Sequence, residues 1–453
     1  MKKSGFHILF FILAAALALF FSGGSVAVLL VIVISLFAVI MQTVRIKNQE
    51  DRHYAERLVL ITLSTYIVSS LFFSAAFEGG QTFLMSDPLT YFQQLGLRTM
   101  DFDAREYLAE SYMQYSNLDV LHLIWLRFII IIANNYLDGA SVLYLTLTNV
   151  FFGALSIGVL YRILLTIVPN FKAYRYSLAF ALLSQFHFYS VSYVRDIIIA
   201  FFFILAIEIL LKKYSFKNVI FLFLLSLLIW GFRMFFGVFM FLVTLFYLYW
   251  GIKGTKGGRI ISYALVLLVL IVAVPAILRS ELFELSTSEV SSYQELYDEN
   301  TTTSGLSNKL NSLPHGAKEA ALFVYSQMNP FPFYDAFPVA NKPCHYYMAT
   351  VRGFFAVYWF FISFGLMYML FLSGGLKLLL PYEKWLLLIC GVFILLNSTQ
   401  TDVRRLMAMY PLLLYFYVKS REVNIKNFAR LNINQNLAFI YFGLLVVYAA
   451  LKL

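Results

Sequence analysis

The chain has 453 residues, of which 61% are hydrophobic and only 13% are charged. An ordinary soluble domain is about 45–50% apolar and about 25% charged, so this composition excludes a water-soluble globular fold. The net charge of +10 is explained by basic loops on one side of a membrane and requires no nucleic-acid partner.

Long apolar stretches recur along the whole chain and predict an all-α, polytopic transmembrane protein. About 20 apolar residues of helix cross the hydrocarbon core, and a helix satisfies its own backbone hydrogen bonds there. The first two stretches are separated only by Ser22–Ser25, which favours a retained helical hairpin over a cleaved signal peptide. About 13 spans are expected, at 6–22, 25–44, 58–77, 140–166, 176–192, 197–213, 217–231, 236–250, 260–278, 350–373, 384–397, 405–419 and 436–452.

The distribution of charge predicts the orientation of these spans. With the N-terminus in the cytoplasm and alternating sides, the inner segments hold 21 of the 34 basic residues but 6 of the 24 acidic ones. Cytoplasmic loops carry an excess of Lys and Arg, so this arrangement is the expected one. Cys344 then falls in an external loop and Cys390 in a span, so a disulfide between them is not expected.

The segment 118–137 is the one stretch that resists this scheme. A span here would invert every later loop, so we interpret it as an interfacial helix with His122, Trp125 and Arg127 at the headgroup level. Two external regions with interfacial helices follow, at 78–139 and 279–349. The expected organisation is an N-terminal hairpin with a basic loop, a transmembrane module, a large external loop and C-terminal helices, at 1–57, 58–278, 279–349 and 350–453.

The string Ser86-Asp87-Pro88-Leu89-Thr90-Tyr91 follows the third span on the external side. Asp87, four residues before Tyr91, could accept a proton or hold a metal beside a lipid-linked substrate. The alternative is a solvated aspartate that caps an interfacial helix, because Asp before Pro is a common helix start.

Arg195 and Asp196 form a second external pair, between the fifth and sixth spans. They could be only an anchor and an N-cap for the next helix, since a charge at the edge of a span costs less than one at its centre. Their predicted position on the same side as Asp87 favours a shared site.

Arginines also recur at external helix ends, at Arg233 and at Arg404-Arg405. A guanidinium offers a two-point fork for phosphate, so arginines on one face suit a phosphate or pyrophosphate headgroup. For any one of them alone, the simpler interpretation is a long side chain that reaches the interface.

The second external loop contributes His315 as a candidate base and Lys318 as a candidate phosphate contact. A lone exposed histidine is more often incidental than catalytic. The sequence has no Gly-rich phosphate loop followed by Lys-Ser/Thr, so nothing indicates an ATP-driven motor.

The order of these features resembles the GT-C glycosyltransferases over about residues 58–250. The matching elements are the span 58–77, Asp87 with Tyr91, the interfacial 118–137, the pair of spans around Lys172 and Arg175, and Arg195-Asp196. Within that class the chain also looks like bacterial O-antigen and exopolysaccharide polymerases, which are almost wholly membranous. It departs from the family because the first loop lacks the paired Asp-Glu of many members, so Asp101 and Asp103 stay open as alternatives to Asp87.

The resemblance implies transfer of a sugar or oligosaccharide from a polyprenyl-(pyro)phosphate carrier, at the extracytoplasmic face of a bacterial inner membrane. Asp87 and Asp196 would be the catalytic carboxylates. The implied partners are the polyprenyl-linked donor, a glycan or lipid-linked acceptor and membrane lipid. The resemblance indicates no organic cofactor and leaves open a divalent cation. The residues expected to bind substrate are Tyr91, Arg195, Arg233, His315, Lys318, Arg404 and Arg405.

Two other classes of protein compete with this interpretation. A polysaccharide or lipid-linked saccharide transporter, or flippase, needs a central cavity lined by charged residues rather than sites at one face. A non-catalytic membrane scaffold would use its outer charges only as anchors. Convergence of Asp87, Asp196, Arg233 and Arg404-Arg405 on one cavity open to the outer face and the lipid would favour the enzyme.

Overall fold

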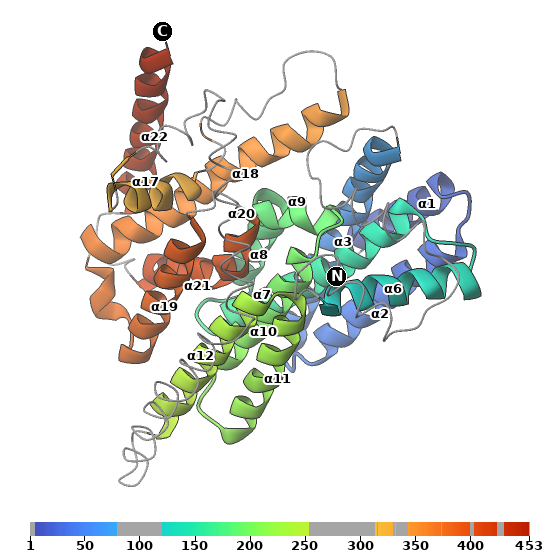
Figure 1. Ribbon diagram of the computed structural model, residues 1–453, viewed down its shortest axis with the longest axis horizontal. Coiled ribbons are helices and arrows are strands. Elements are labelled where there is room, and N and C mark those ends of the chain that lie inside the picture. The colour runs from blue at the N-terminus through green and yellow to red at the C-terminus, as the bar shows by residue number, and fades with distance from the viewer. Residues whose placement is uncertain are drawn as a thin grey trace. The chain divides into compact units, whose positions relative to one another are not determined.

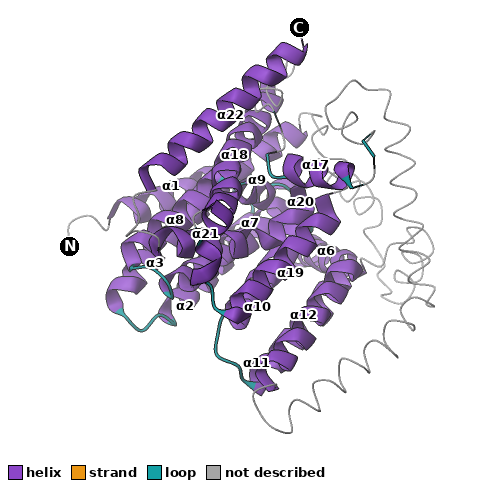
Figure 2. Ribbon diagram, turned by 90° about the vertical axis from the view of Figure 1, so that its left-hand side faces the viewer, coloured by secondary structure: helices purple, strands orange, loops and turns teal. Residues whose placement is uncertain are grey.

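The computed structural model describes residues 5–78, 120–252, 313–314, 316–328, 331, 343–372, 374–398, 403–423 and 430–452. Of these residues 88% are helical and none is in a strand (Figure 2). The all-α class predicted from the sequence is therefore confirmed for the described part of the chain.

Six helices in the described residues are long and apolar enough to cross a membrane, rather than the roughly 13 expected from hydrophobicity. Three further apolar helices are shorter, and the predicted span 260–278 lies outside the described residues. Other predicted spans are short or interrupted, which a count of apolar stretches does not reveal. The six candidates are Val26–Val44, Gln49–Ala75, Val142–Leu165, Met234–Ile252, Val351–Phe371 and Ile433–Ala450.

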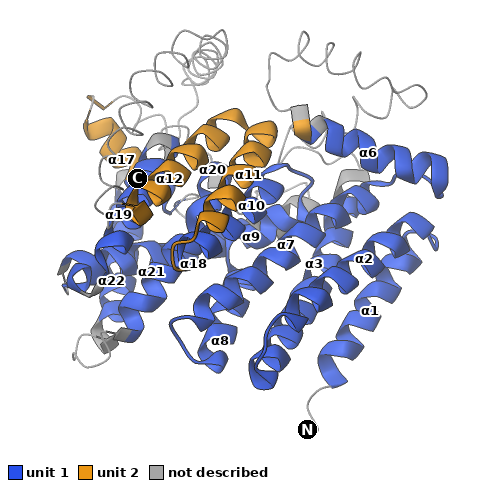
Figure 3. Cartoon of the chain, turned by 90° about the horizontal axis from the view of Figure 1, so that it is seen from below, with its two compact units in different colours: residues 1–101, 122–211, 324–453 blue, residues 102–121, 212–323 orange. Residues whose placement is uncertain are grey.

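The chain forms two compact units (Figure 3). Unit 1 combines Met1–Asp101, His122–Leu211 and Val324–Leu453, and unit 2 combines Phe102–Leu121 and Lys212–Phe323. These boundaries differ from the expected organisation along the chain, because segments far apart in the sequence pack together in unit 1.

The N-terminal half of unit 1 is built around one buried helix. α7 packs against α2, α3, α8, α9 and α10. In its most apolar stretch, 83% of the residues are buried. The helices of this half are α1 (Gly5–Phe21), α2 (Val26–Val44), α3 (Gln49–Glu78), α6 (Val120–Tyr136), α7 (Val142–Leu165), α8 (Asn170–Leu183), α9 (Gln185–Val191) and α10 (Asp196–Leu210) (Figure 1).

The C-terminal half of unit 1 packs on this core through aromatic side chains. The Trp359 ring stacks on Tyr410 at 3.8 Å between centroids and meets Phe180 at 6.5 Å. These contacts join the C-terminal helices to α8. The elements of this half are α18 (Pro343–Met367), η4 (Tyr368–Leu372), η5 (Gly375–Leu378), α19 (Pro381–Ser398), α20 (Val403–Leu406), η6 (Met407–Met409), α21 (Tyr410–Val423) and α22 (Arg430–Lys452).

Ion pairs join helix ends that the sequence predicts to be cytoplasmic. Arg162 pairs with Glu208, with Nη2 and Oε2 2.9 Å apart, and Lys172 pairs with Glu422 at 2.5 Å. The Tyr161 hydroxyl donates to the Asp51 carbonyl oxygen at 3.0 Å. These contacts gather ends of α3, α7, α8, α10 and α21 at one end of unit 1, which we call the basic end. That the basic end faces the cytoplasm is a prediction from charge.

A different contact joins segments that the sequence predicts to be external. The backbone N–H groups of Val26 and Ala27 donate to the Asp138 carboxylate at 2.9 Å each. Asp138 thereby satisfies donors at the N-terminus of α2, which have no partner within the helix. The turn after α6 is in this way tied to the N-terminal hairpin.

α6 has only 17 residues, and its apolar part is among the helices too short to count as candidate spans. Tyr144 of α7 donates to the Ile129 carbonyl oxygen at 3.0 Å. His122 and Arg127, which the interfacial interpretation places at the headgroup level, are only 2% and 4% exposed, and that level stays a prediction. Packing within the protein covers them, which a helix considered alone does not predict.

Unit 2 contains a helical hairpin and the start of α17 (Ala317–Ser326). The hairpin is formed by α11 (Phe216–Phe232) and α12 (Met234–Ile252), which are joined by Arg233 alone. A Cβ on Gly237 would collide with the backbone of Trp230, so glycine allows the two helices to meet closely beside the turn.

Candidate functional site

The predicted fifth span, 176–192, is interrupted at Ser184. Ser184 has extended backbone angles (φ −115°, ψ 164°) and separates α8 from α9. Its hydroxyl donates to the Phe180 carbonyl oxygen at 2.6 Å and accepts from the Phe186 N–H at 3.2 Å. Non-helical backbone at membrane depth is tolerated only where it is buried in protein or lines a cavity. The break therefore marks a candidate functional site.

Side chains of α3 and α9 satisfy the carbonyl groups left open where α8 ends. The Tyr66 hydroxyl donates to the Ala181 oxygen at 2.9 Å. The His187 Nδ1 lies 3.3 Å from the Leu182 oxygen. A helix end leaves its last carbonyls without intrahelical partners, and in an apolar environment each unsatisfied group costs several kcal/mol.

The contacts of His187 define the tautomer of its neutral ring. A carbonyl oxygen can only accept, so Nδ1 carries the proton. Nε2 then accepts from the Ser69 hydroxyl, whose oxygen is 2.9 Å away. The ring also stacks on Tyr66, with centroids 4.8 Å apart. His187 thus links α9 to α3 at a fixed orientation.

Asn149 of α7 holds the chain after α9. Its Nδ2 donates to the Ser192 oxygen at 2.7 Å and to the Val194 oxygen at 2.8 Å. Asn149 is 2% exposed, so the amide supplies both donors to carbonyls that water does not reach. This fixes the 192–195 link, which connects α9 to α10.

The link ends in the predicted pair Arg195-Asp196. Asp196 is the first residue of α10 and is 5% exposed, whereas Arg195 is half-buried. A helix N-terminus carries open N–H groups and partial positive charge, which favour a carboxylate. The capping interpretation of Asp196 and a role in a site are both compatible with this position.

The predicted last arginine pair lies at the start of a helical segment that is continuous over 403–423. α20, η6 and α21 follow one another directly, with a tighter 3-10 turn at Met407–Met409 between them. α20, which carries the half-buried Arg404 and Arg405, packs against α9, and η6 packs against α10 (Figure 1). The structure therefore brings the elements that bear Arg195, Asp196, Arg404 and Arg405 together.

Arg352 of α18 is a further cation beside α9. Its guanidinium carbon lies 5.6 Å from the centroid of the Phe188 ring. Its Nε is buried without a hydrogen-bond partner. Burying a donor unsatisfied costs about 1–3 kcal/mol, and more for a charged group. Arg352 completes the set that we call the α9 arginine cluster: Arg195, Arg352, Arg404 and Arg405.

The other predicted site residues lie outside the described residues or belong to unit 2. Asp87, Tyr91 and His315 lie outside the described residues, as do Asp101 and Asp103. Arg233 and Lys318 belong to unit 2. The Arg233 guanidinium carbon is 5.3 Å from the Phe236 ring centroid, and Lys318 is the second residue of α17.

No group of three or more His, Cys, Asp or Glu side chains gathers in the described part of the chain. The structure therefore identifies no residues there for the divalent cation left open by the sequence, and that cation stays a prediction.

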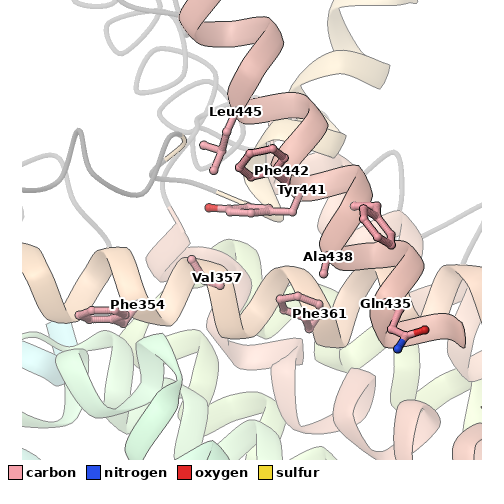
Figure 4. Close-up of a pocket in the computed structure, with 9 residues that line it drawn as sticks. Phe354, Val357, Phe361, Gln435, Ala438, Tyr441, Phe442 and Leu445 are labelled. Atoms are coloured by element: carbon pink, nitrogen blue, oxygen red, sulfur yellow. The ribbon is translucent and has the colours of Figure 1, made fainter. Parts of the chain in front are cut away.

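A separate groove of about 720 Å³ lies between α18 and α22. Figure 4 shows Phe354, Val357 and Phe361 of α18 beneath the side chains of α22. Gln435 and the Tyr441 hydroxyl are its only polar groups. Such a lining suits hydrocarbon and offers no charge to a sugar or a phosphate, so the candidate site is the α9 arginine cluster.

Sequence reasoning missed Tyr66, Ser69, Asn149, His187 and Arg352. A signal was present in Ser184-Gln185-Phe186-His187, a polar run inside an apolar stretch. Polar residues inside a span usually mark packing contacts or function. The partners on α3 and α7 are more than 30 residues away in the chain, and only the tertiary structure reveals them.

Comparison with protein-family models, with curated proteins and with solved structures gives no match to this chain.

Proposed function

We propose that this protein is a membrane glycosyltransferase that transfers a sugar or oligosaccharide from a polyprenyl-(pyro)phosphate carrier. The observation that carries the proposal is the packing of α20 against α9. It brings Arg404 and Arg405 to the interrupted segment that ends in Arg195-Asp196. Several guanidinium groups near one carboxylate suit a phosphate leaving group together with a hydroxyl nucleophile.

The interrupted helices support a ligand site at this place. Spans broken at membrane depth bring polar groups and helix ends to a site that continuous helices would leave apolar. Here the breaks are held by hydrogen bonds from Tyr66, His187 and Asn149. A preorganised site of this kind stabilises developing charge without rearranging during the reaction.

In the proposed reaction the acceptor hydroxyl oxygen attacks the anomeric carbon of the donor. The bond from that carbon to the phosphate oxygen breaks, and its electron pair leaves on the phosphate. Asp87 would take the hydroxyl proton, Arg404 and Arg405 would stabilise the departing phosphate, and Asp196 would orient Arg195 or the acceptor. The role of Asp87 rests on the sequence alone.

The proposed setting is the extracytoplasmic face of a bacterial inner membrane, where the product would be a surface polysaccharide. The positive-inside rule supports this orientation of the Arg195-Asp196 link. The resemblance covers both transfer of a single sugar and repeat-unit polymerisation.

The test replaces Arg404 and Arg405 by lysine, one at a time. Lysine keeps the charge but loses the two-point fork, so at least one variant should lower glycan production by about tenfold or more at matched membrane abundance. Arg175→Lys is the control, because Arg175 is an exposed arginine of α8. The readout is glycan chain length on a gel. Full production by both Arg404→Lys and Arg405→Lys would overturn the phosphate role.

The second candidate is a transporter or flippase for a lipid-linked saccharide. Its supporting observation is the interrupted span α8–α9, because discontinuous helices form the substrate sites of many transporters. Proteoliposomes loaded with a labelled lipid-linked saccharide distinguish the candidates. An enzyme forms a new glycosidic bond, whereas a transporter moves the unchanged saccharide across the bilayer.

A further inference from the structure

Arg352 lies over the Phe188 ring of α9 and has no hydrogen-bond or ion-pair partner in the described part of the chain. Its Nε is buried. We propose that Arg352 is an anion-binding residue that contacts a phosphate or pyrophosphate group at the α9 arginine cluster. The inference deepens the proposed function and rests on it for the identity of the lipid.

The Phe188 ring determines how the Arg352 cation is presented. Phe188 is 1% exposed, so it is a fixed platform, and the guanidinium carbon lies 5.6 Å from its centroid. A guanidinium over a ring is attracted by the π electrons while its N–H donors remain available at its edge. The Phe188 ring therefore positions the Arg352 guanidinium, and no described residue accepts a hydrogen bond from its N–H groups.

On α10, α18 and α20, arginines outnumber carboxylates beside α9. α18, α20 and α10 all pack against α9. On these helices and the 192–195 link, the described residues nearest α9 include the four arginines of the α9 arginine cluster. They include one carboxylate, that of Asp196. Asp402 lies next to α20 in the sequence but outside the described residues, and including it would leave the sum positive. Cations at a membrane site pair with counter-charges, and no described carboxylate pairs with Arg352, so an external anion would satisfy its buried Nε.

Phosphate chemistry fits this requirement best. Arginine forks match phosphate oxygens at two points, and several guanidinium groups can divide the oxygens of a pyrophosphate among them. The same chemistry is present in a lipid diphosphate and in free pyrophosphate. The experiment must therefore separate these two sources.

The experiment measures binding of farnesyl diphosphate to the full-length protein in lipid nanodiscs, by calorimetry. Inorganic pyrophosphate and farnesol are the comparison ligands. A hydrogen bond to a charged group contributes enough that its loss weakens binding roughly tenfold to hundredfold. We expect this loss for Arg352→Gln and a smaller loss for Arg352→Lys, which keeps the charge over Phe188.

The matched control is Arg175→Gln. The Arg175 guanidinium carbon also lies 5.6 Å from a phenylalanine ring, that of Phe171, but Arg175 is near the start of α8, which ends at the break. Farnesyl diphosphate should bind to this variant as to the wild type. Thermal melting of each variant identifies any that has lost its fold, and Arg352→Lys then carries the test.

Two results would overturn the inference. One is wild-type affinity for farnesyl diphosphate in both Arg352 variants, and the other is equal binding of farnesol, which lacks the anion. Inorganic pyrophosphate that binds as tightly as farnesyl diphosphate supports the anion site and assigns it to a free ligand. The binding assay does not depend on sugar transfer, so loss of the glycosyltransferase proposal would leave its result intact.

Discussion

Arg162 of α7 and Glu208 of α10 form a two-point ion pair, with Nε–Oε1 at 3.1 Å and Nη2–Oε2 at 2.9 Å. The side chains are 17% and 16% exposed, so the pair is screened only in part. The Lys172–Glu422 ion pair and the Tyr161–Asp51 hydrogen bond belong to the same basic end. The Arg162–Glu208 pair therefore joins the ends of α7 and α10 at the basic end, which is predicted to be cytoplasmic, and the candidate site lies toward the other ends of these helices.

Breaking that pair should destabilise unit 1. Removing one partner leaves a largely buried charge, at a cost between the surface and fully buried cases, of about 2 kcal/mol. Arg162→Gln and Glu208→Gln should each lower the melting temperature in detergent, and the double variant should recover part of the loss. Singles as stable as the wild type would show that the pair is not a stabilising contact.

Cysteine labelling tests the orientation. In a Cys344→Ser background, with Cys390 buried, Tyr136→Cys should react with a membrane-impermeant maleimide in intact cells, because Tyr136 is 79% exposed on the predicted outer side. Lys47→Cys should react only after permeabilisation. The opposite pattern would invert the molecule and place the α9 arginine cluster in the cytoplasm.

Asn149→Leu should loosen the 192–195 link. The change keeps the size of the side chain but removes the donors to the Ser192 and Val194 carbonyls, at about 1–3 kcal/mol for each unsatisfied group. We expect a lower melting temperature and weaker farnesyl diphosphate binding. Asn218→Leu in unit 2 is the control, since Asn218 also donates twice but in a half-buried position. Unchanged binding by Asn149→Leu would contradict a positioning role.

The Asp138 contact predicts a dependence on pH. Hydrogen bonds from the Ala27 and Val26 N–H groups hold the pKa of the Asp138 carboxyl below its usual value. Because the folded pKa is lowered, the stabilisation is complete above the unfolded pKa of about 3.9. It is lost as the pH falls through the folded value. Thermal stability of Asp138→Asn relative to wild type, measured from pH 7 to pH 3, checks this: the deficit should be present at pH 7 and shrink toward pH 3. A constant deficit would contradict it.

Long apolar helices were predictable from the sequence, and the interruptions were not. The stretches around α2 and α7 are long and mostly apolar, so their length and composition predict them. Residues 176–192 contain a polar run but still read as one span by length, whereas the structure divides them at Ser184, where Tyr66 of α3 supplies a hydrogen bond from elsewhere in the chain. The distribution of charge predicts one external side for Arg195, Asp196, Arg404 and Arg405. The position of Arg352 could not be predicted, because its relation to Phe188 depends on how α18 packs.

The break at Ser184 also constrains how the protein enters its membrane. α8 and α9 have 14 and 7 residues, so neither reaches across the hydrocarbon core, which needs about 20. Their open carbonyls find donors on α3 and α7, which are made earlier. Stable integration of this segment is therefore expected to depend on α3 and α7, because their side chains satisfy carbonyl groups that the segment cannot satisfy itself.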